Sequence, residues 1–311
     1  MHTSFQFLTF FVKPLLYGYS FKQKRRILLF LFYYPLSFHY FCKKYYDMKN
    51  LNGSTLQFEQ DNMINFEEST HTYTDKDGNT LTSVSNVIRQ FFKEFDAEYW
   101  SLRKCYGNEN AAAALREEWE CKGCFATQAG TFLHLQIENY LNGKTDASMR
   151  CNMRFEGEYL SKEDTTSIEK EWNHFLKFKE EVPFTPFRTE WKVCDFDRKI
   201  AGTIDLLCSN EDGTYEMFDW KRSSKIDPDE INKWDNGING LEHLTDTSYI
   251  HYCLQQNLYR YILEKNYGLK ISKMNLVILH PLYNSYRVVT VPRMEKEVEI
   301  ILNRFCVTSP K

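Results

Sequence analysis

The chain has 311 residues, 42% of them hydrophobic, 16% aromatic and 26% charged, with a formal net charge of -3. This composition fits one large globular domain or two small ones. The nine cysteines are scattered without a framework spacing, which argues against a disulfide scaffold and indicates reduced thiols in an intracellular protein. Cys121 and Cys124 form a lone CxxC with no second pair, which argues against a zinc or iron–sulfur site.

Residues 1–47 differ from the rest of the chain. Residues 1–46 contain no Asp or Glu, seven Lys or Arg and sixteen aromatic residues. The apolar run from Ile27 to Cys42 is sixteen residues long, which is short of the roughly 20 residues that a membrane span needs. Four interpretations stay open: a mitochondrial targeting peptide, a signal anchor, an interfacial membrane segment, or sequence upstream of a functional start at Met48. The predicted folded domain therefore covers residues 48–311.

That domain shows a readable order of helices and strands. The stretch 71–84 alternates around Asp77-Gly78 and predicts a β-hairpin, followed by a helix through "VIRQFF" that Ser83, Ser85 or Asn86 would cap. Helices are predicted at 96–107, 110–120, 127–142, 165–182, 246–267 and 293–306, and strands at 187–195, 198–208, 214–221, 273–281 and 285–292. The order predicts an α/β or α+β domain with a helical first half and a mixed β-sheet flanked by helices.

The stretch "AGTIDLLCSNEDGTYEMFDWKRSS", residues 201–224, reads as two apolar strands around a turn, yet it carries charges inside the strands. Because side chains alternate along a strand, pairing through the turn can bring Asp205, Asp219 and Lys221 to one side of the sheet. Unpaired buried charges are very costly, so these groups must compensate one another or hold a cation. Two carboxylates beside a lysine predict a divalent-metal site. The alternative is a charge pair on an exposed edge strand.

Two predicted helices carry polar pairs four residues apart, which places each pair on one helix face. On 127–142 the pair is His134 and Glu138, preceded by Gly130, where the missing side chain would allow another backbone to come close. On 246–267 the pair is Gln255 and Tyr259. Taken alone, the first reads as a partly exposed ion pair and the second as a surface glutamine beside a core tyrosine.

Together and in this order, "GTFLHLQIE", "AGTIDLL", "FDWKRS" and "LQQNLYRYIL" resemble the PD-(D/E)XK nuclease superfamily, in its RecB-type branch of mitochondrial and phage exonucleases, over about residues 70–290. The resemblance implies a restriction-endonuclease-like core and a metal-dependent DNA exonuclease or end-processing nuclease. Two features depart from relatives: the first strand acid has no proline before it, and the four-cysteine iron–sulfur staple of some members is missing, since only Cys306 follows Cys253.

The resemblance also implies roles for individual residues. His134, Asp205 and Asp219, with the backbone carbonyl of Trp220, would bind Mg²⁺ or Mn²⁺. Lys221 would be the catalytic lysine that assists the attacking water, and Gln255 and Tyr259 would form the QxxxY motif beside the site. Glu190 corresponds to an acid often found on the preceding strand, and whether it or Glu138 joins the metal site is left open.

Binding of DNA needs basic residues near the phosphates. Since the whole chain carries -3 and residues 1–46 carry +7, residues 47–311 carry about -10, so the footprint must be local. The candidate basic residues are Arg103, Lys104, Lys221, Arg222, Lys225 and Lys233, and the candidate stacking residues for unpaired bases are Trp100, Trp220 and Trp234. This pattern favours DNA with a single-stranded end, while cleavage polarity, DNA versus RNA preference and a helicase or polymerase partner stay open.

Two other hypotheses remain. The chain would be a catalytically silent nucleic-acid-binding module on the same fold, against which the intact set of His134, Asp205, Asp219 and Lys221 argues. Otherwise these charges are structural ion pairs of an unrelated protein that is membrane-associated through residues 1–46. The expected location is the cytoplasm or nucleoid, a host cell, or the mitochondrial matrix.

Overall fold

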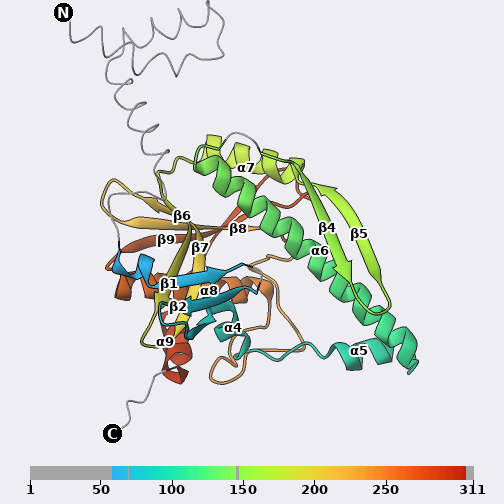
Figure 1. The fold of residues 1–311 in the computed structure, drawn as a ribbon. Coiled ribbons are helices and arrows are strands. Elements are labelled where there is room, and N and C mark those ends of the chain that lie inside the picture. Colours follow the sequence, from blue (N-terminus) through green and yellow to red (C-terminus); the bar gives the residue numbers. More distant parts are fainter. Residues whose placement is uncertain (1–57, 69, 145–146, 306–311) are drawn as a thin grey trace, which may run out of the picture. The chain divides into compact units, whose positions relative to one another are not determined.

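The computed structural model describes residues 58–68, 70–144 and 147–305, which form a mixed α/β domain (Figure 1). Its main sheet has the strand order β1-β2-β3-β7-β8-β9-β10, with β6 paired to β7. The strands are β1 (Ile64–Glu67), β2 (Thr72–Asp75), β3 (Thr80–Ser83), β6 (Pro186–Asp195), β7 (Ile200–Ser209), β8 (Tyr215–Lys221), β9 (Ile271–Ile278) and β10 (Arg287–Thr290). The pairs β3–β7 and β8–β9 are parallel and the others antiparallel, so the predicted mixed sheet is confirmed.

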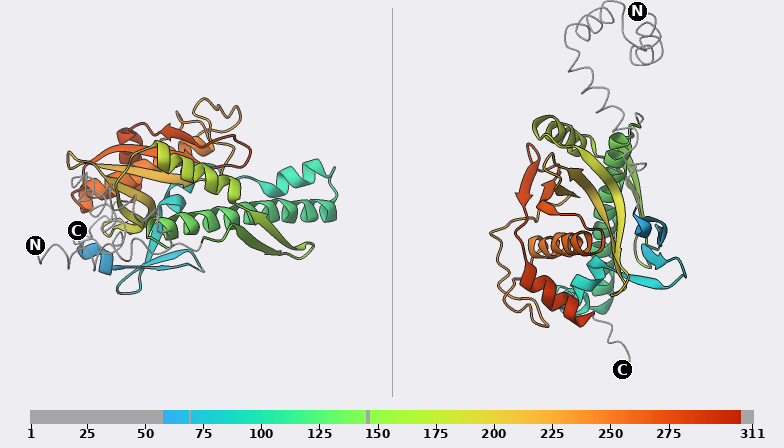
Figure 2. Two further views of the ribbon diagram at one scale, coloured as in Figure 1. Left: turned by 90° about the horizontal axis from the view of Figure 1, so that it is seen from above. Right: turned by 90° about the vertical axis from the view of Figure 1, so that its left-hand side faces the viewer.

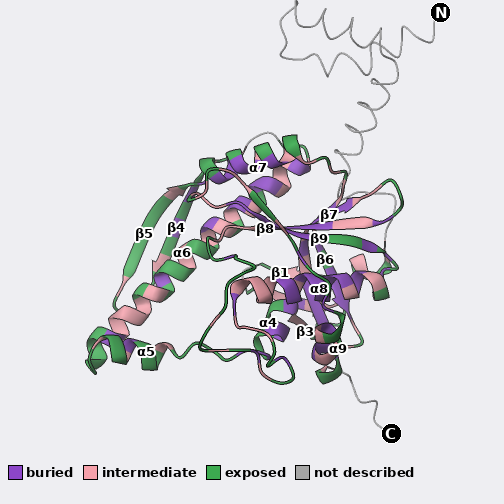
Figure 3. Cartoon of the chain, turned by 180° about the vertical axis from the view of Figure 1, so that it is seen from behind, coloured by how far each residue is buried: buried purple, intermediate pink, exposed green. Residues whose placement is uncertain are grey.

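Helices cover both faces of this sheet. The helices are α4 (Val84–Arg89), α5 (Ala97–Lys104), α6 (Glu109–Leu141), α7 (Glu169–Glu181), α8 (Ser248–Asn266) and α9 (Glu295–Arg304), with a short 3-10 turn η1 (Glu59–Asn62). On β8, Met217 packs into a core with α4, α8 and α9, whereas its neighbour Phe218 packs into a second core with α6 and α7. Strands β7, β8 and β9 between these layers are mostly buried, as are nine of the 19 residues of α8 (Figure 3). The domain is therefore a sheet enclosed between two helical layers.

One long helix, α6, replaces the two helices predicted at 110–120 and 127–142. It has 33 residues and begins at Asn108, whose side chain accepts a hydrogen bond from the Ala111 N–H at 3.0 Å. The predicted separation into helices at 110–120 and 127–142 is wrong, because tertiary contacts outweigh the weak helix propensity of the intervening Gly123. In the middle of α6, Ala129 packs against Cys151 and Met153 of β4 (Arg150–Glu156).

β4 and β5 (Ser161–Ser167) form a separate two-stranded sheet along α6. The residue pattern predicts neither of these strands, nor β1, and it places the start of α7 a few residues early, within β5. The turn of this hairpin is attached to α6, because the carboxylate of Glu117 accepts hydrogen bonds from three successive backbone N–H groups, residues 158–160, each at 2.7 Å. Together α5, α6 and the hairpin extend beyond the main sheet (Figure 2).

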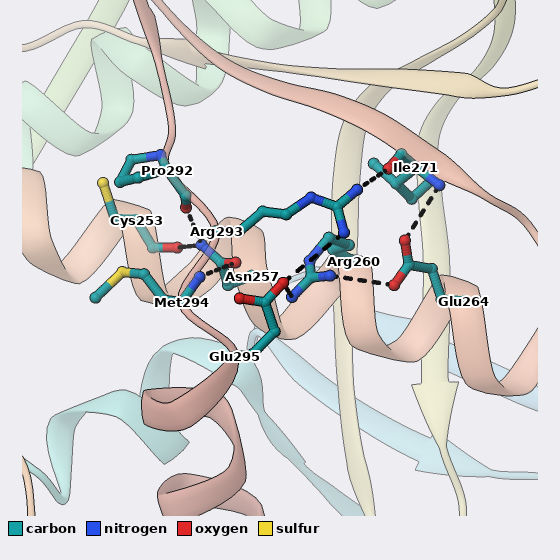
Figure 4. A network of polar contacts seen from close by, with 9 residues as sticks. All are labelled: Cys253, Asn257, Arg260, Glu264, Ile271, Pro292, Arg293, Met294 and Glu295. Atoms are coloured by element: carbon teal, nitrogen blue, oxygen red, sulfur yellow. Dashed lines mark hydrogen bonds and ion pairs between the residues drawn. The ribbon is translucent and has the colours of Figure 1, made fainter.

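A network of polar contacts holds α8 to the C-terminal part of the domain (Figure 4). The buried Asn257 side chain donates to the Pro292 carbonyl at 2.9 Å and accepts from the Met294 N–H at 2.9 Å. About one turn along the helix, the Arg260 guanidinium lies 3.4 Å from the Glu295 carboxylate. These contacts fix the position of α8, and with it the predicted QxxxY motif.

The remaining helices and strands agree with the sequence prediction to within a few residues. The N-cap of α4 is Ser83, whose Oγ accepts from the Asn86 N–H at 3.2 Å. Over the described ranges no helix combines the length and the hydropathy that crossing a bilayer requires. The interpretations offered for residues 1–47 fall outside these ranges.

Candidate metal centre

β7 changes its neighbour on one edge partway along its length. β6 pairs with β7 from Ile200 to Cys208 and occupies one edge throughout. On the other edge, β3 pairs with residues 200–201 and β8 with residues 206–209. Because a strand has only two edges for pairing, residues 202–205 face a gap in the sheet between β3 and β8. Asp205 stands at the end of that gap.

Three carboxylates from neighbouring strands meet there. The β6–β7 ladder is paired on both sides of Glu190 and Asp205, which places these two residues opposite each other. The β7–β8 ladder ends one residue before Asp205 and Asp219 would pair, and the Trp220 N–H donates to Asp205 Oδ2 at 2.8 Å. Glu190 has a φ of 45°, a left-handed conformation that is uncommon outside glycine. The acids thus form a row across β6, β7 and β8.

His134 approaches this row from α6. Its Nε2 lies 2.9 Å from the Trp220 carbonyl oxygen, and its Nδ1 lies 3.5 Å from Asp205 Oδ2 and 3.8 Å from Glu190 Oε1. When Nε2–H donates to the carbonyl, Nδ1 carries the lone pair that faces the carboxylates. Metal-ligating histidines are commonly held this way by a second hydrogen bond. The Trp220 carbonyl, predicted as a metal ligand, here orients the histidine.

The geometry of His134, Glu190 and Asp205 fits a divalent cation. One ligand atom from each residue lies within 4.8 Å of the others. A cation about 2.0–2.2 Å from its nitrogen and oxygen ligands places those ligand atoms roughly 3–4 Å apart. Carboxylate oxygens suit Mg²⁺, and an added imidazole shifts the preference toward Mn²⁺. Glu190 therefore joins His134 and Asp205 as a candidate metal ligand, and Asp219 adjoins this cluster.

Lys221 is held on the Asp219 side of the centre. Its Nζ lies 2.6 Å from Asp219 Oδ2, with the two side chains 14% and 4% exposed. The ammonium also donates to Gln255 Oε1 at 3.3 Å and lies 4.3 Å from the centroid of the Tyr252 ring. A carboxylate, an amide and an aromatic ring therefore fix the position of this charge. Gln255, predicted beside the site, contacts the lysine directly.

Tyr259 packs against β7. A Cβ at Gly202 would lie 2.5 Å from Tyr259 Cε1 and 2.7 Å from its hydroxyl oxygen. From β2, the Tyr73 hydroxyl lies 2.8 Å from Thr203 Oγ1. Both tyrosines are buried, so the gap beside residues 202–205 is bounded by aromatic side chains from α8 and β2.

Burial and crowding shift the ionisation of these groups. Burial, reinforced by Asp205, raises the pKa of Glu190 to about 9. Burial raises the pKa values of Asp205 and Asp219 to about 6, although Lys221 opposes the shift. Burial, followed by Lys221, lowers the pKa of His134 to about 4, so its imidazole is neutral at pH 7. Burial opposes the charge of Lys221, but Asp219 and Asp205 raise its pKa above the usual value. At neutral pH, Glu190 therefore holds a proton that a bound cation would displace.

Several residues singled out in the sequence serve the fold instead. The Trp220 side chain is 1% exposed and packs against Phe175 and Phe178, so it offers no stacking surface. The Arg222 guanidinium donates to the fully buried Glu171 at 2.8 Å, which removes it from the predicted DNA footprint. A Cβ at Gly130 would meet nothing within 4 Å, so the predicted close backbone approach is wrong.

Other predicted residues are on the surface, and some partners were not foreseen. Trp100 and Trp234 are 42% and 90% exposed. The position of Tyr252 near Gln255 could be predicted from the sequence, because it lies three residues before Gln255 on the same helix. The contact of Tyr73 with Thr203 could not be predicted, because 130 residues separate them and no local pattern joins them.

Comparisons with known proteins add little. No protein-family model and no curated protein matches the chain. Among solved structures, one titled "Crystal structure of SSO0001" matches with 12% identity, covering 72% of this chain and 73% of the other, at a TM-score of 0.29. A likeness this weak carries no argument about fold or function.

Proposed function

We propose that this protein is a divalent-metal-dependent deoxyribonuclease of the PD-(D/E)XK superfamily. Its reaction would be the hydrolysis of phosphodiester bonds by an exonuclease or end-processing enzyme acting on DNA with a single-stranded end. The observation that carries the proposal is the meeting of His134, Glu190 and Asp205 with the Asp219–Lys221 pair at one gap in the sheet. The order of the stretches that supply His134, Asp205, Asp219 and Lys221, followed by the one with Gln255 and Tyr259, supports the same assignment.

The residues divide into two groups. His134, Glu190 and Asp205 would hold Mg²⁺ or Mn²⁺, with Asp219 beside them. The ion, when bound, supplies charge that neutralises phosphoryl oxygens and favours deprotonation of water. Lys221 keeps its proton at neutral pH and is aimed by Asp219 and Gln255, so it provides a fixed positive charge and N–H donors next to the scissile phosphate.

Digestion of a fluorescently labelled oligonucleotide with a single-stranded end tests the proposal. The full chain should shorten it in Mg²⁺ or Mn²⁺ but not in EDTA, and the Asp219→Asn variant should be inactive. Binding without cleavage in either metal would identify a nucleic-acid-binding module instead. A protein that neither binds nor cuts the strand would contradict the assignment to this superfamily.

A further inference from the structure

A cavity of about 490 Å³ is lined in part by the first turn of α8, the helix that also carries Gln255, and the roles assigned above do not use it. One wall is the segment that leads into α5, and the other is formed by the loop between β8 and α8 with the first turn of α8. Its lining includes Phe95, Trp100, Lys225, Asn232 and His251. Cavities of this size hold small ligands or single groups of larger ones.

The walls are fastened to each other by contacts within the protein. The His251 ring lies 4.0 Å from the Phe92 ring, between centroids, and its Nε2 lies 2.9 Å from Asp246 Oδ1. The Lys93 ammonium lies 3.4 Å from Asp235, and the Asn239 side chain donates to the Gln90 carbonyl at 2.8 Å. The cavity is therefore preformed, which lowers the entropic cost of binding.

Exposed hydrophobic side chains gather around this opening. Ten large ones are exposed in the described part of the chain. Phe95 and Trp100 line the cavity, Tyr99 lies 5.2 Å from Trp100 between ring centroids, and Ile231 and Trp234 neighbour lining residues of the loop. Two of the ten therefore line the cavity, and three more contact a lining residue or are adjacent to one in the chain; such a grouping favours a binding surface over scattered surface residues.

The cavity is close to the residues that would act on the phosphate. His251 precedes Gln255 by four residues on α8, a separation of about 6 Å along the helix axis. Its neighbour Tyr252 contacts the Lys221 ammonium through its ring. Lys225, on the same wall as His251, lies four residues after Lys221. A strand whose phosphate is at the metal centre therefore reaches this cavity with a nearby nucleotide.

The charge of the side chains that line the cavity determines whether it favours the phosphate or the base of a nucleotide. Five carboxylic residues line the cavity against two lysines: Glu94, Asp96, Glu230, Asp235 and Asp246 against Lys93 and Lys225. This excess of acids disfavours a phosphate. It favours a neutral ring with amino groups, because carboxylates accept hydrogen bonds from the amino groups of cytosine and other bases, while the aromatic rim offers stacking faces.

We propose that this cavity binds one unpaired nucleobase of the substrate strand, next to the scissile phosphate, and that it prefers bases with an exocyclic amino group over thymine. The inference rests on the proposed nuclease function and adds a subsite to it. Stacking on Trp100 at the rim holds the base, and Glu230, which is not among the carboxylates that pair with Lys93 and His251, accepts its amino hydrogens.

The test uses the Lys221→Ala protein, which should bind without cutting, and single strands that carry 2-aminopurine at successive positions from the end. On binding, we expect the 2-aminopurine emission to change at least twofold relative to the free strand at one position only. This change should disappear when Trp100→Ala is combined with Lys221→Ala. Trp100→Phe, which keeps a ring, should retain most of the change. Tyr106→Ala is the matched control, because Tyr106 is 99% exposed just beyond α5 and does not line the cavity.

Base preference gives a second measurement. The wild-type chain should cut oligo-dC several-fold faster than oligo-dT, and Glu230→Gln should reduce that ratio. Equal emission at every position, or a signal that Trp100→Ala leaves unchanged, would overturn the subsite while cleavage by the wild type still supports the nuclease. Absence of cleavage by the wild type in both metals would overturn the nuclease itself.

Discussion

The ring of Tyr259 occupies the space in which any residue other than glycine would place its Cβ at position 202. The nearest ring atom lies 2.5 Å from that Cβ position, well inside van der Waals contact. This contact joins α8 to β7 three residues before Asp205. The tyrosine of the QxxxY motif therefore helps to fix the strand that carries a proposed metal ligand.

Gly202→Ala should displace Tyr259 and destabilise the protein by about 1–3 kcal/mol, as overpacking of a core does. At roughly 2–4 °C per kcal/mol for a chain of this size, the melting temperature should fall by several degrees. Gly123→Ala is the control, since a Cβ there meets nothing within 4 Å and an alanine in helix α6 should be neutral or stabilising. Wild-type melting and activity in Gly202→Ala would show that Tyr259 can move freely.

Asp219→Asn and Lys221→Ala should each reduce cleavage by roughly 10²–10⁴-fold while the fold is kept. The first variant removes the carboxylate that adjoins the proposed metal and orients Lys221, and the second removes the positive charge proposed to act on the phosphate. Initial rates on a labelled oligonucleotide, with near-ultraviolet circular dichroism as the check on folding, measure this. Lys273→Ala is a matched control, because that ammonium pairs with Glu216, near the opposite end of β8. Near wild-type turnover in either site variant would refute the site assignment.

His134→Ala should weaken metal binding more than DNA binding, because the imidazole nitrogen is proposed as a ligand and not as a phosphate contact. We expect the Mn²⁺ concentration at half-maximal activity to rise by about tenfold or more, with little change in DNA anisotropy measured in EDTA. If the Mn²⁺ concentration at half-maximal activity is the same in His134→Ala as in the wild type, His134 is the partner of an ion pair and not a metal ligand.

Glu190→Gln should stabilise the metal-free protein at alkaline pH. The folded-state pKa of Glu190, about 9, lies above its usual value of 4.5, so the folded state binds the proton more tightly. The stability that this group contributes is complete below pH 4.5 and is lost as the pH rises toward 9. In EDTA the melting temperature of the variant should therefore be higher than that of the wild type at pH 8 and equal to it at pH 4. At pH 8, saturating Mn²⁺ should instead make the melting temperature of the wild type the higher of the two, since only the wild type has the Glu190 carboxylate as a metal ligand.

Much of the fold was readable because its signals are local. The hairpin of β7 and β8 has apolar strands around an Asn-Glu-Asp-Gly turn, and α8 carries Leu254, Leu258 and Ile262 at helical spacing. The break assumed near Gly123 failed because the helix there is supported by β4, which is distant in sequence. β5 was missed because its residues are almost all exposed and lack the apolar alternation of a half-buried strand.

The site was readable to the extent that strand and helix spacing determine it. Asp205, Asp219 and Lys221 follow from one hairpin, and Gln255 follows from helical spacing. The gap between β3 and β8 could not be predicted from the sequence, because it arises where two strands that are distant in the chain pair with different parts of the same edge of β7. The same holds for Arg222, since only the folded chain places the buried carboxylate of Glu171 beside it.

The attachment of α8 to residues 292–295 has a consequence for synthesis of the protein. Every side chain of the proposed centre, from His134 to Tyr259, leaves the ribosome before the segment whose backbone satisfies Asn257. Until residues 292–294 have been synthesised, the Asn257 side chain, on the helix that carries Gln255 and Tyr259, lacks its hydrogen bonds to Pro292 and Met294. Alignment of the proposed site residues is therefore coupled to synthesis of the chain through residues 292–295, and an interrupted translation product ending before Pro292 would have these residues without the framework that aligns them.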